Sequence, residues 1–361
     1  MTPEQAVKAA ISLFQAQNIA GAEHLLRSAV ATDPAIYSGL YCLAELLERT
    51  GRADEAIGYY ETCMRLRPGM AQASTRRALI LLRRHLGVSG APQGRARNPH
   101  ARGLVQMTTL GANGRFGNQL LQYAFLRCYA ERFGFEFEVP DWIGRVLFGL
   151  DDPTISRALP QLKETQADLH GCLAGRRDQV FVNVDLWGYF TSDTSVLAPW
   201  RDRIRSWFTP VPSLTDPIRA DLERLRANHG TLVAIHLRRG DFGTDQHWIA
   251  PESWYLRWLE ETWSRLDRPR LYIASDDAVI HRYFAAYEPV TAAGLRPGPS
   301  GAEFLVDFSV LRSADLVAVS NSSFSVMATL LADGPQQVVR PDRGRGGLIS
   351  YNPWSCPVLL G

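Results

Sequence analysis

Residues 232–241 read LVAIHLRRGD, a short apolar run that ends in two arginines, a glycine and an aspartate. An apolar run of this length that ends in turn residues is typical of a buried strand. Similar runs occur at about 105–110, 271–275, 315–319 and 336–340, and longer helical patterns separate them. Strands that alternate with helices predict an α/β fold with a parallel sheet.

The residues that follow these strands are candidate site residues, because ligands of parallel sheets bind beyond the carboxyl ends of the strands. Arg238 and Arg239 follow the strand at 232–237, which contains His236. The planar guanidinium groups suit a diphosphate, which they can bind through two hydrogen bonds each. Asp241 is placed to orient one of the arginines. A purely structural Arg–Asp ion pair at the strand end is the alternative.

A glycine-rich segment, GANGRFGNQ at 111–119, lies between the first strand and a predicted helix. Glycines let backbone N–H groups approach a phosphate or a sugar closely. Their spacing matches neither the dinucleotide fingerprint nor the P-loop, so binding of NAD or ATP is not indicated. A simple tight turn would use the same residues. The candidate binding residues are Gly114, Arg115, Phe116, Gly117, Asn118 and Gln119.

The strands at 271–275 and 315–319 are also followed by polar residues. A carboxylate after the first of them suits the N–H donors of guanine, although a Ser–Asp pair also suits a helix N-cap. Hydroxyl groups at the start of the helix after the second favour an anion site. The candidates are Ser275, Asp276, Asp277, Asn321, Ser322, Ser323 and Phe324.

The N-terminal part of the chain contains an internal repeat with a spacing of 34 residues between Asp33 and Arg67, each of which precedes a proline. Small residues keep register between the copies, which lets paired helices approach closely. The pattern resembles the tetratricopeptide repeat and predicts an all-helical module over 1–86, with a covering helix at about 70–85. Residues 87–104 are rich in Gly, Pro and Arg and predict a linker.

Composition excludes several classes of function. The 361 residues carry a net charge of +2, so no overall field would attract nucleic acid. The N-terminus lacks the pattern of a signal peptide, and no apolar run reaches the roughly 18 residues of a membrane span. We therefore expect a protein of the cytoplasm, either free or at the inner face of the cell membrane. Five scattered cysteines predict reduced, mostly buried thiols and no zinc site.

Five segments, in this order, resemble the GDP-fucose-dependent fucosyltransferases, particularly the alpha-1,2-fucosyltransferase family. They are GRFGNQLLQYA, LWGYFTSD, HLRRGDF, LYIASDD and DFSVLRSADLVAVSNSSFSVMATLL, and the resemblance covers roughly residues 107–354. The glycine-rich segment is also similar to that of protein O-fucosyltransferases. The resemblance implies a GT-B fold, with a Rossmann-like acceptor half at 105–225 and a Rossmann-like donor half at 226–361.

The resemblance also implies roles for individual residues. Arg238 would bind the β-phosphate of the donor with His236 and Arg239 beside it, Asp276 or Asp277 would bind guanine, Ser322 and Ser323 the pyrophosphate, and Asn118 would face donor and acceptor. No metal or other cofactor would be required, and the reaction would invert the anomeric carbon of fucose. Val326 and Met327 stand where family members commonly have two tryptophans, which leaves the acceptor open.

Three questions stay open at this stage. Candidates for a general base are Asp245 and His247, with Glu303 behind them, although each suits a surface residue equally well. The acceptor is a glycan hydroxyl in an alpha-1,2-type linkage, or a polypeptide if the enzyme is similar to protein O-fucosyltransferases. A non-catalytic GDP-sugar-binding scaffold is the third alternative. The helical module would serve either a protein partner or self-association.

Overall fold

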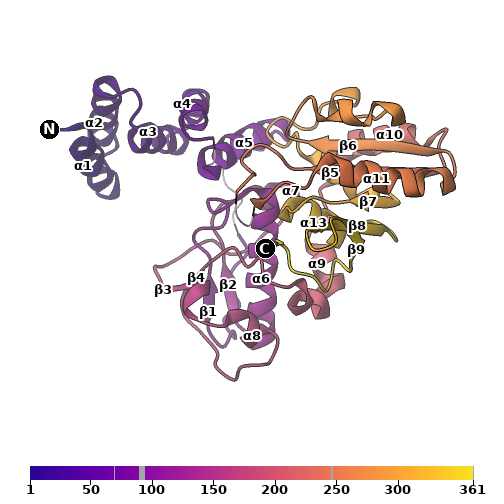
Figure 1. Cartoon of the computed structure of the whole chain (residues 1–361). Helices are drawn as coiled ribbons and strands as arrows, with labels where there is room; N and C mark the ends of the chain where they lie inside the picture. Colours follow the sequence, from indigo (N-terminus) through magenta and orange to yellow (C-terminus); the bar gives the residue numbers. More distant parts are fainter. Residues whose placement is uncertain (69, 89–93, 245–246, 361) are drawn as a thin grey trace. The chain divides into compact units, whose positions relative to one another are not determined.

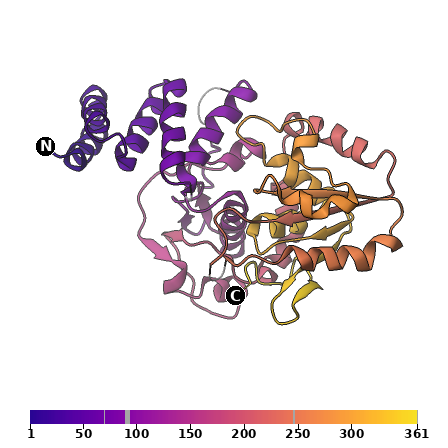
Figure 2. The ribbon, with the colours of Figure 1, turned by 45° about the horizontal axis from the view of Figure 1, so that its top comes forward.

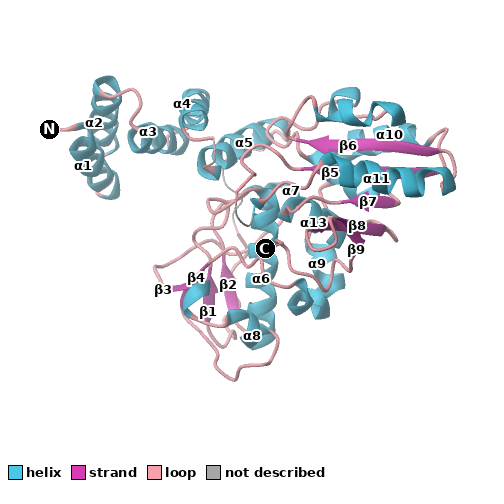
Figure 3. Cartoon of the chain, in the orientation of Figure 1, coloured by secondary structure: helices cyan, strands magenta, loops and turns pink. Residues whose placement is uncertain are grey.

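The computed structural model describes residues 1–68, 70–88, 94–244 and 247–360. The chain forms two compact units, residues 1–90 and residues 91–361. The first unit is all-helical, and the second is mixed α/β with two largely parallel sheets (Figures 1 and 3). The predicted class is therefore confirmed. Within the described ranges, every helix is too short or too polar to cross a lipid bilayer.

The first unit consists of helices that pack in succession along the chain (Figure 2). Their bounds are α1 (Pro3–Gln15), α2 (Ile19–Thr32), α3 (Tyr37–Arg49), α4 (Ala53–Leu66) and α5 (Ala71–His85). The bounds of α3 and α4 lie 34 residues after those of α1 and α2. The sequence repeat is thus a repeated helix pair.

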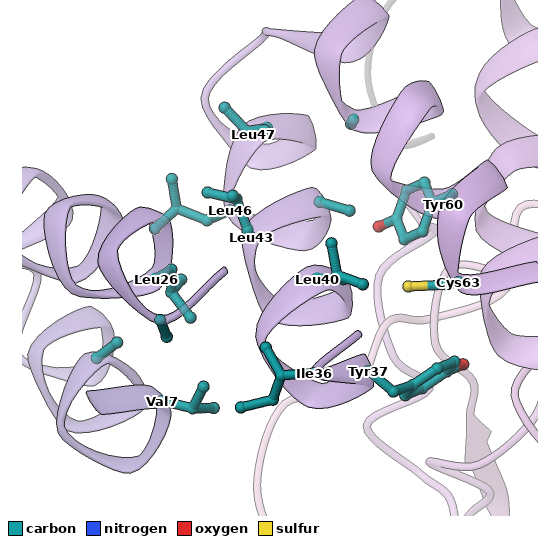
Figure 4. Packing of buried hydrophobic residues seen from close by; sticks show 14 of the residues in the cluster. Val7, Leu26, Ile36, Tyr37, Leu40, Leu43, Leu46, Leu47, Tyr60 and Cys63 are labelled. Atoms are coloured by element: carbon teal, nitrogen blue, oxygen red, sulfur yellow. The ribbon is translucent and has the colours of Figure 1, made fainter. Parts of the chain in front are cut away.

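Small residues allow the helices of each pair to pack closely. Ala10 and Ala22 of the first pair, and Ala44 and Ala56 of the second, are completely buried. Figure 4 shows α3 at the centre of this core, with Leu26 of α2 on one side and Tyr60 and Cys63 of α4 on the other. Each helix therefore needs its neighbours to cover its apolar face.

The part of the second unit that the structure describes contains two sheets. The first has the order β2-β1-β4-β3, with every pair parallel, and consists of β1 (Leu104–Gln106), β2 (Glu136–Glu138), β3 (Gln161–Lys163) and β4 (Val184–Trp187). The second has the order β6-β5-β7-β8-β9, with β9 antiparallel to β8, and consists of β5 (Thr231–Leu237), β6 (Pro269–Ser275), β7 (Leu316–Ala318), β8 (Gln337–Asp342) and β9 (Gly347–Ser350).

The helices of this unit connect the strands. They are α6 (Phe116–Phe133), α7 (Ile143–Leu147), α8 (Leu169–Leu173), α9 (Arg201–Trp207), α10 (Pro212–Arg226), α11 (Glu252–Thr262), α12 (Leu305–Ser313) and α13 (Ser323–Leu330). Most of α6 is buried, because it contacts β1 and β2 of the first sheet as well as α13, which follows a strand of the second.

The strand orders place a switch point in each sheet. From β5 the chain passes to β6 on one side and later to β7 on the other, so the order reverses at β5. In the first sheet the neighbours of β1 are β2 on one side and β4 on the other. Ligands of open α/β sheets bind beyond the strand ends at such points. The glycine-rich segment follows β1, and Arg238 follows β5.

Four of the five predicted strands are confirmed as β5, β6, β7 and β8. The strand predicted at 105–110 is shorter, because β1 ends at Gln106 and a turn follows in which the Leu110 N–H donates to the Met107 carbonyl. Thr108 fixes this turn by donating from its backbone N–H and its hydroxyl to buried Asp185, at 2.9 and 2.6 Å. The sequence analysis missed β2, β3, β4 and β9, which are three or four residues long.

The end of the segment predicted as a linker is bound to the second unit. Both outer nitrogens of the Arg95 guanidinium donate to the Glu136 carboxylate, at 3.0 and 2.8 Å. The Asn98 N–H donates to the same carboxylate at 2.6 Å, and Arg97 forms an ion pair with buried Glu138. These acidic side chains belong to β2, so residues 94–103 lie along this strand and are not a free tether.

The helical unit allows a first prediction about stability. Leu43 of α3 is fully buried, so Leu43→Ala should lower the free energy of unfolding of this unit by about 2–5 kcal/mol, which is the usual cost of such a cavity. Denaturant titration followed by circular dichroism would measure the loss. Leu66→Ala is the control, because Leu66 of α4 is 42% exposed. Equal effects of the two changes would contradict the described core.

A second prediction concerns Asp307 of α12, which accepts a hydrogen bond of 2.6 Å from the hydroxyl of Tyr272 on β6. Burial raises the pKa of Asp307 from 3.8 to about 6, although this hydrogen bond opposes the shift. The folded protein therefore holds this proton more tightly than the unfolded chain. Stability should fall as the pH rises from about 4 to 6, by roughly 3 kcal/mol for this group.

The variant Asp307→Asn tests this expectation, since an amide cannot ionise. Its free energy of unfolding, relative to that of the wild type, should increase between pH 4 and pH 7 and change little above that. Asp267→Asn is the matched control, because the Asp267 side chain is 71% exposed. A constant difference between Asp307→Asn and the wild type across this range would refute the prediction.

Candidate active site

The carboxyl end of β5 presents two arginines with different partners. The Arg238 guanidinium pairs with Asp276 at 2.5 Å and with Asp241. The Arg239 guanidinium donates to Glu252 at the start of α11, at 2.6 Å, and to the Ala250 carbonyl. Arg239 is thus tied into the surrounding structure, whereas Arg238 lies between two carboxylates.

Asp276, at the end of β6, supports this arrangement. One carboxylate oxygen accepts from the Arg239 backbone N–H at 2.7 Å, and the other pairs with Arg238. Gly240 is required beside it: its φ is +25°, and a Cβ there would lie 2.5 Å from the Asp276 carboxylate. The adjacent strands β5 and β6 therefore fix the position of Arg238 together.

Asp241 links the two sheets of this unit. Its carboxylate pairs with Arg238 and lies 3.3 Å from the guanidinium of Arg115 in the glycine-rich segment. Burial alone would raise the pKa of Asp241, but the two guanidinium groups outweigh it, and the pKa lies below its usual value. Burial and the charge of Arg238 lower the pKa of Arg115. Two cations therefore lie close enough to repel each other around one carboxylate.

The N-termini of α6 and α13 meet beside these charges. A Cβ on Gly117, in the first turn of α6, would lie 2.5 Å from the Phe324 backbone nitrogen and 2.6 Å from the Ser323 carbonyl carbon. Ser322 is the N-cap of α13, and its hydroxyl accepts from the Phe324 N–H at 3.3 Å. Each N-terminus carries a partial positive charge and free backbone donors. Their proximity favours an anion.

His236, the penultimate residue of β5, is buried and neutral. Burial, together with the charges of Arg238 and Arg239, lowers its pKa to about 3. Its Nδ1 lies 2.7 Å from the hydroxyl of Ser320, and its ring contacts Phe324 at 5.3 Å. A neutral imidazole offers one donor and one acceptor, so His236 can position a group without adding charge.

Several predicted site residues lie in the core or support the local backbone. Phe116 packs against Phe148, Phe304 and Phe308, with ring centroids as close as 4.5 Å. Asn321 is buried and binds both backbone polar groups of Leu360 near the C-terminus.

Gln119 and the residues after β6 also make backbone contacts. Buried Gln119 donates to the Gly114 carbonyl at 3.0 Å. The Ser275 hydroxyl donates to the Leu237 carbonyl and accepts from the Asp277 N–H, and Asp277 accepts from the Val279 N–H. These contacts shape the loops that carry Arg115 and Asp276. Asn118, which is half-buried, lies against Gly114.

The base candidates differ in their surroundings. The ring of His247 contacts Phe242 at 4.9 Å, and Phe242 lies under the guanidinium of Arg238 at 5.3 Å. Glu303 accepts from the Gly301 N–H at 3.0 Å and supports its own loop. Asp245 lies outside the described residues. The described His, Cys, Asp and Glu residues form no group of three or more that could hold a metal ion.

The sequence analysis did not identify three residues that shape the site. Glu252 holds Arg239, Ser320 contacts His236, and Tyr189 lies beside the glycine-rich segment with 41% of its surface exposed. Tyr189 belongs to the LWGYFTSD segment, so the motif itself was the available signal. Ser320 likewise lies within a quoted motif, whereas Glu252 becomes visible only through a contact between separate segments.

No protein-family model matches this chain, and no curated protein sequence is similar to it. Among solved structures, NodZ alpha-1,6-fucosyltransferase soaked with GDP-fucose is 15% identical, with a TM-score of 0.47 over 69% of this chain and 99% of that chain. A mutant of Arabidopsis thaliana FUT1 in complex with GDP is 14% identical, with a TM-score of 0.45 over 80% and 79%. An O-GlcNAc transferase mutant of Thermobaculum terrenum is 16% identical, with a TM-score of 0.26 over 88% and 71%.

Proposed function

We propose that this chain is an inverting glycosyltransferase that transfers L-fucose from GDP-β-L-fucose to a hydroxyl group of a glycan. The observation that carries the proposal is the convergence of positive groups around Asp241. Arg115 and Arg238 pair with this carboxylate, and the N-termini of α6 and α13 meet nearby. This arrangement suits a diphosphate in size and charge.

The diphosphate would be bound mainly by Arg238 and the helix N-termini. A guanidinium carries five N–H donors, and the ion pairs with Asp241 and Asp276 use only part of those of Arg238. Ser322 and Ser323 open α13. The Ser322 N–H donates to the Ser320 carbonyl at 2.8 Å, so the Ser323 N–H and the serine hydroxyls would face the phosphate oxygens. The neutral ring of His236 and the loop held by Arg239 would complete this side of the site.

Fucosyl transfer requires that negative charge on the leaving diphosphate be stabilised as the sugar becomes cationic. Fixed donors that act on this charge in a site with little water supply the largest part of such catalysis. Arg238 would have this role, with Asp241 and Asp276 holding its guanidinium in place. This proposal assigns to Arg238 and the helix N-termini the charge stabilisation that a divalent cation provides in other transferases.

The acceptor hydroxyl must lose a proton during attack. Asp241 is a poor base, because its lowered pKa and two guanidinium partners favour the ionised form. We therefore assign orientation of the arginines to Asp241. Of the described base candidates we assign this role to His247, because its ring contacts Phe242, which in turn contacts the Arg238 guanidinium. Asp276 already pairs with Arg238, so the guanine contact falls to Asp277 in this proposal.

The helical unit fits a tetratricopeptide-like module. Two helix pairs repeat at 34 residues, with fully buried alanines at equivalent places in both. A module of this kind presents a surface to a protein partner or to a second copy of the chain. We propose this role for residues 1–86 and an alpha-1,2-type linkage for the product, on the basis of the sequence motifs.

The third prediction tests the donor and the role of Arg238. Purified wild-type protein should be stabilised thermally by GDP-fucose and should slowly release GDP from it with EDTA present. Arg238→Ala should reduce GDP release about a hundredfold, on the order of 3 kcal/mol, because the developing charge loses its main donor. Arg257→Ala is the control, since Arg257 is an arginine of α11 that makes only an exposed contact with the Gly346 carbonyl among the described residues.

The outcomes separate the alternatives. GDP-mannose, UDP-glucose and UDP-N-acetylglucosamine serve as comparison donors. Preference for one of these would keep the diphosphate site and reject fucose. Loss of turnover with EDTA, restored by Mg²⁺ or Mn²⁺, would reject the metal-independent mechanism. Donor binding without GDP release or transfer to any acceptor would favour a non-catalytic scaffold.

A further inference from the structure

The sheet edge beside the glycine-rich segment carries an exposed aromatic residue that the donor site does not use. Tyr189 follows β4 and is 41% exposed. It follows a strand of the first sheet, whereas Arg238 and Asp276 follow strands of the second. A single exposed aromatic side chain needs no explanation by itself. The contacts of Tyr189, however, fix its backbone and place its ring.

The backbone of Tyr189 is held by Glu164, which follows β3. The same carboxylate oxygen accepts from the Tyr189 N–H and from the Phe190 N–H, both at 3.0 Å. Gly188 is needed for this contact, because a Cβ there would lie 2.4 Å from that oxygen. Asn113 of the glycine-rich segment donates to the Gly188 carbonyl at 3.2 Å. Two separate segments thus fix one short turn.

The next residue anchors the turn in the core. Phe190 is buried and stacks on Phe125 of α6, with ring centroids 4.2 Å apart. Its φ is +53°, a conformation that a phenylalanine seldom adopts. This strained backbone conformation places the Phe190 side chain in the core and leaves the neighbouring Tyr189 side chain exposed.

The Tyr189 ring lies beside the glycine-rich segment. A Cβ on Gly114 would lie 3.0 Å from Cε1 of Tyr189 and 2.6 Å from the amide nitrogen of Asn118. A partly exposed aromatic ring, a side-chain amide and a residue without a side chain therefore occur together. Trp187 lies two residues earlier, with Lys163 5.6 Å from its ring. Ligand sites combine aromatic surface with a few polar groups in this way.

We propose that Tyr189 is the stacking platform of the acceptor subsite, where the apolar face of a pyranose ring packs on the phenol ring and Asn118 binds a sugar hydroxyl. A sugar suits such a site because one face carries C–H groups and its rim carries hydroxyls, which matches an aromatic face beside polar groups. The inference deepens the proposed function and rests on it in one respect: the sugar bound at Tyr189 is the acceptor only if the chain is a glycosyltransferase. It identifies the substrate class as a carbohydrate and not a polypeptide.

The test measures carbohydrate binding directly on the full chain in the presence of GDP. The probes are the methyl β-glycosides of galactose, glucose and N-acetylglucosamine, observed by saturation-transfer difference NMR. At least one should bind to the wild type, with transfer strongest to protons on one face of the ring. Tyr189→Ala should weaken this binding about five- to tenfold, the usual effect of losing an aromatic contact. Tyr189→Phe, which keeps the ring, should bind nearly as the wild type does.

Two controls separate this effect from unfolding and from the donor site. Val182→Ala truncates an exposed residue near the amino end of the same strand and should leave sugar binding unchanged. Thermal stabilisation by GDP should be the same in Tyr189→Ala and the wild type. Sugar binding by Tyr189→Ala at the wild-type level, or no binding of any probe to the wild type, would overturn the proposal.

The proposed function can fail separately. If GDP-fucose is not turned over while sugar binding still depends on Tyr189, the stacking platform is supported and the assignment of the donor is refuted. If GDP-fucose is hydrolysed but none of the glycosides binds, the donor assignment is supported and the stacking platform is refuted.

Discussion

The backbone contact between Gly117 and Phe324 is the constraint on which the site depends. It brings the N-termini of α6 and α13 together within van der Waals distance, and only a residue without a side chain permits this approach. Two helix N-termini side by side repel each other, because each carries a partial positive charge. Arg115 and Arg238 add full charges at the same place. A counter-charge stabilises this arrangement: Asp241 provides one, and a diphosphate would add to it.

Topology explains why these segments meet. Each sheet reverses its strand order at one strand, β1 in the first and β5 in the second, and the loop after that strand is free of an adjacent crossover. The glycine-rich segment and the Arg238 loop occupy these two positions. Since α6 contacts the first sheet and also α13, it holds the two loops face to face. The charges at the site thus follow from how the sheets are wound.

The sequence was sufficient to predict the strands that carry the site, because β5 and β6 are long apolar runs that end in charged residues. It was not sufficient for β2, β3 and β4, whose short length gives no period. Within one motif it could not separate residues that face the site from residues that face the core. Phe116 and Arg115 are neighbours, yet one packs among aromatic rings and the other pairs with Asp241.

Contacts between distant segments could not be predicted from the sequence, and the reason is physical. A carboxylate such as Asp276 suits guanine, a helix cap or an arginine equally well in chemistry, and only the neighbouring strand decides which partner it meets. Glu164 likewise gives no signal in sequence, although it fixes the turn before Phe190. Both carboxylates follow strands whose neighbour in the sheet supplies the partner. In parallel sheets, side chains after adjacent strands act in pairs, and strand order therefore determines their roles as much as residue type does.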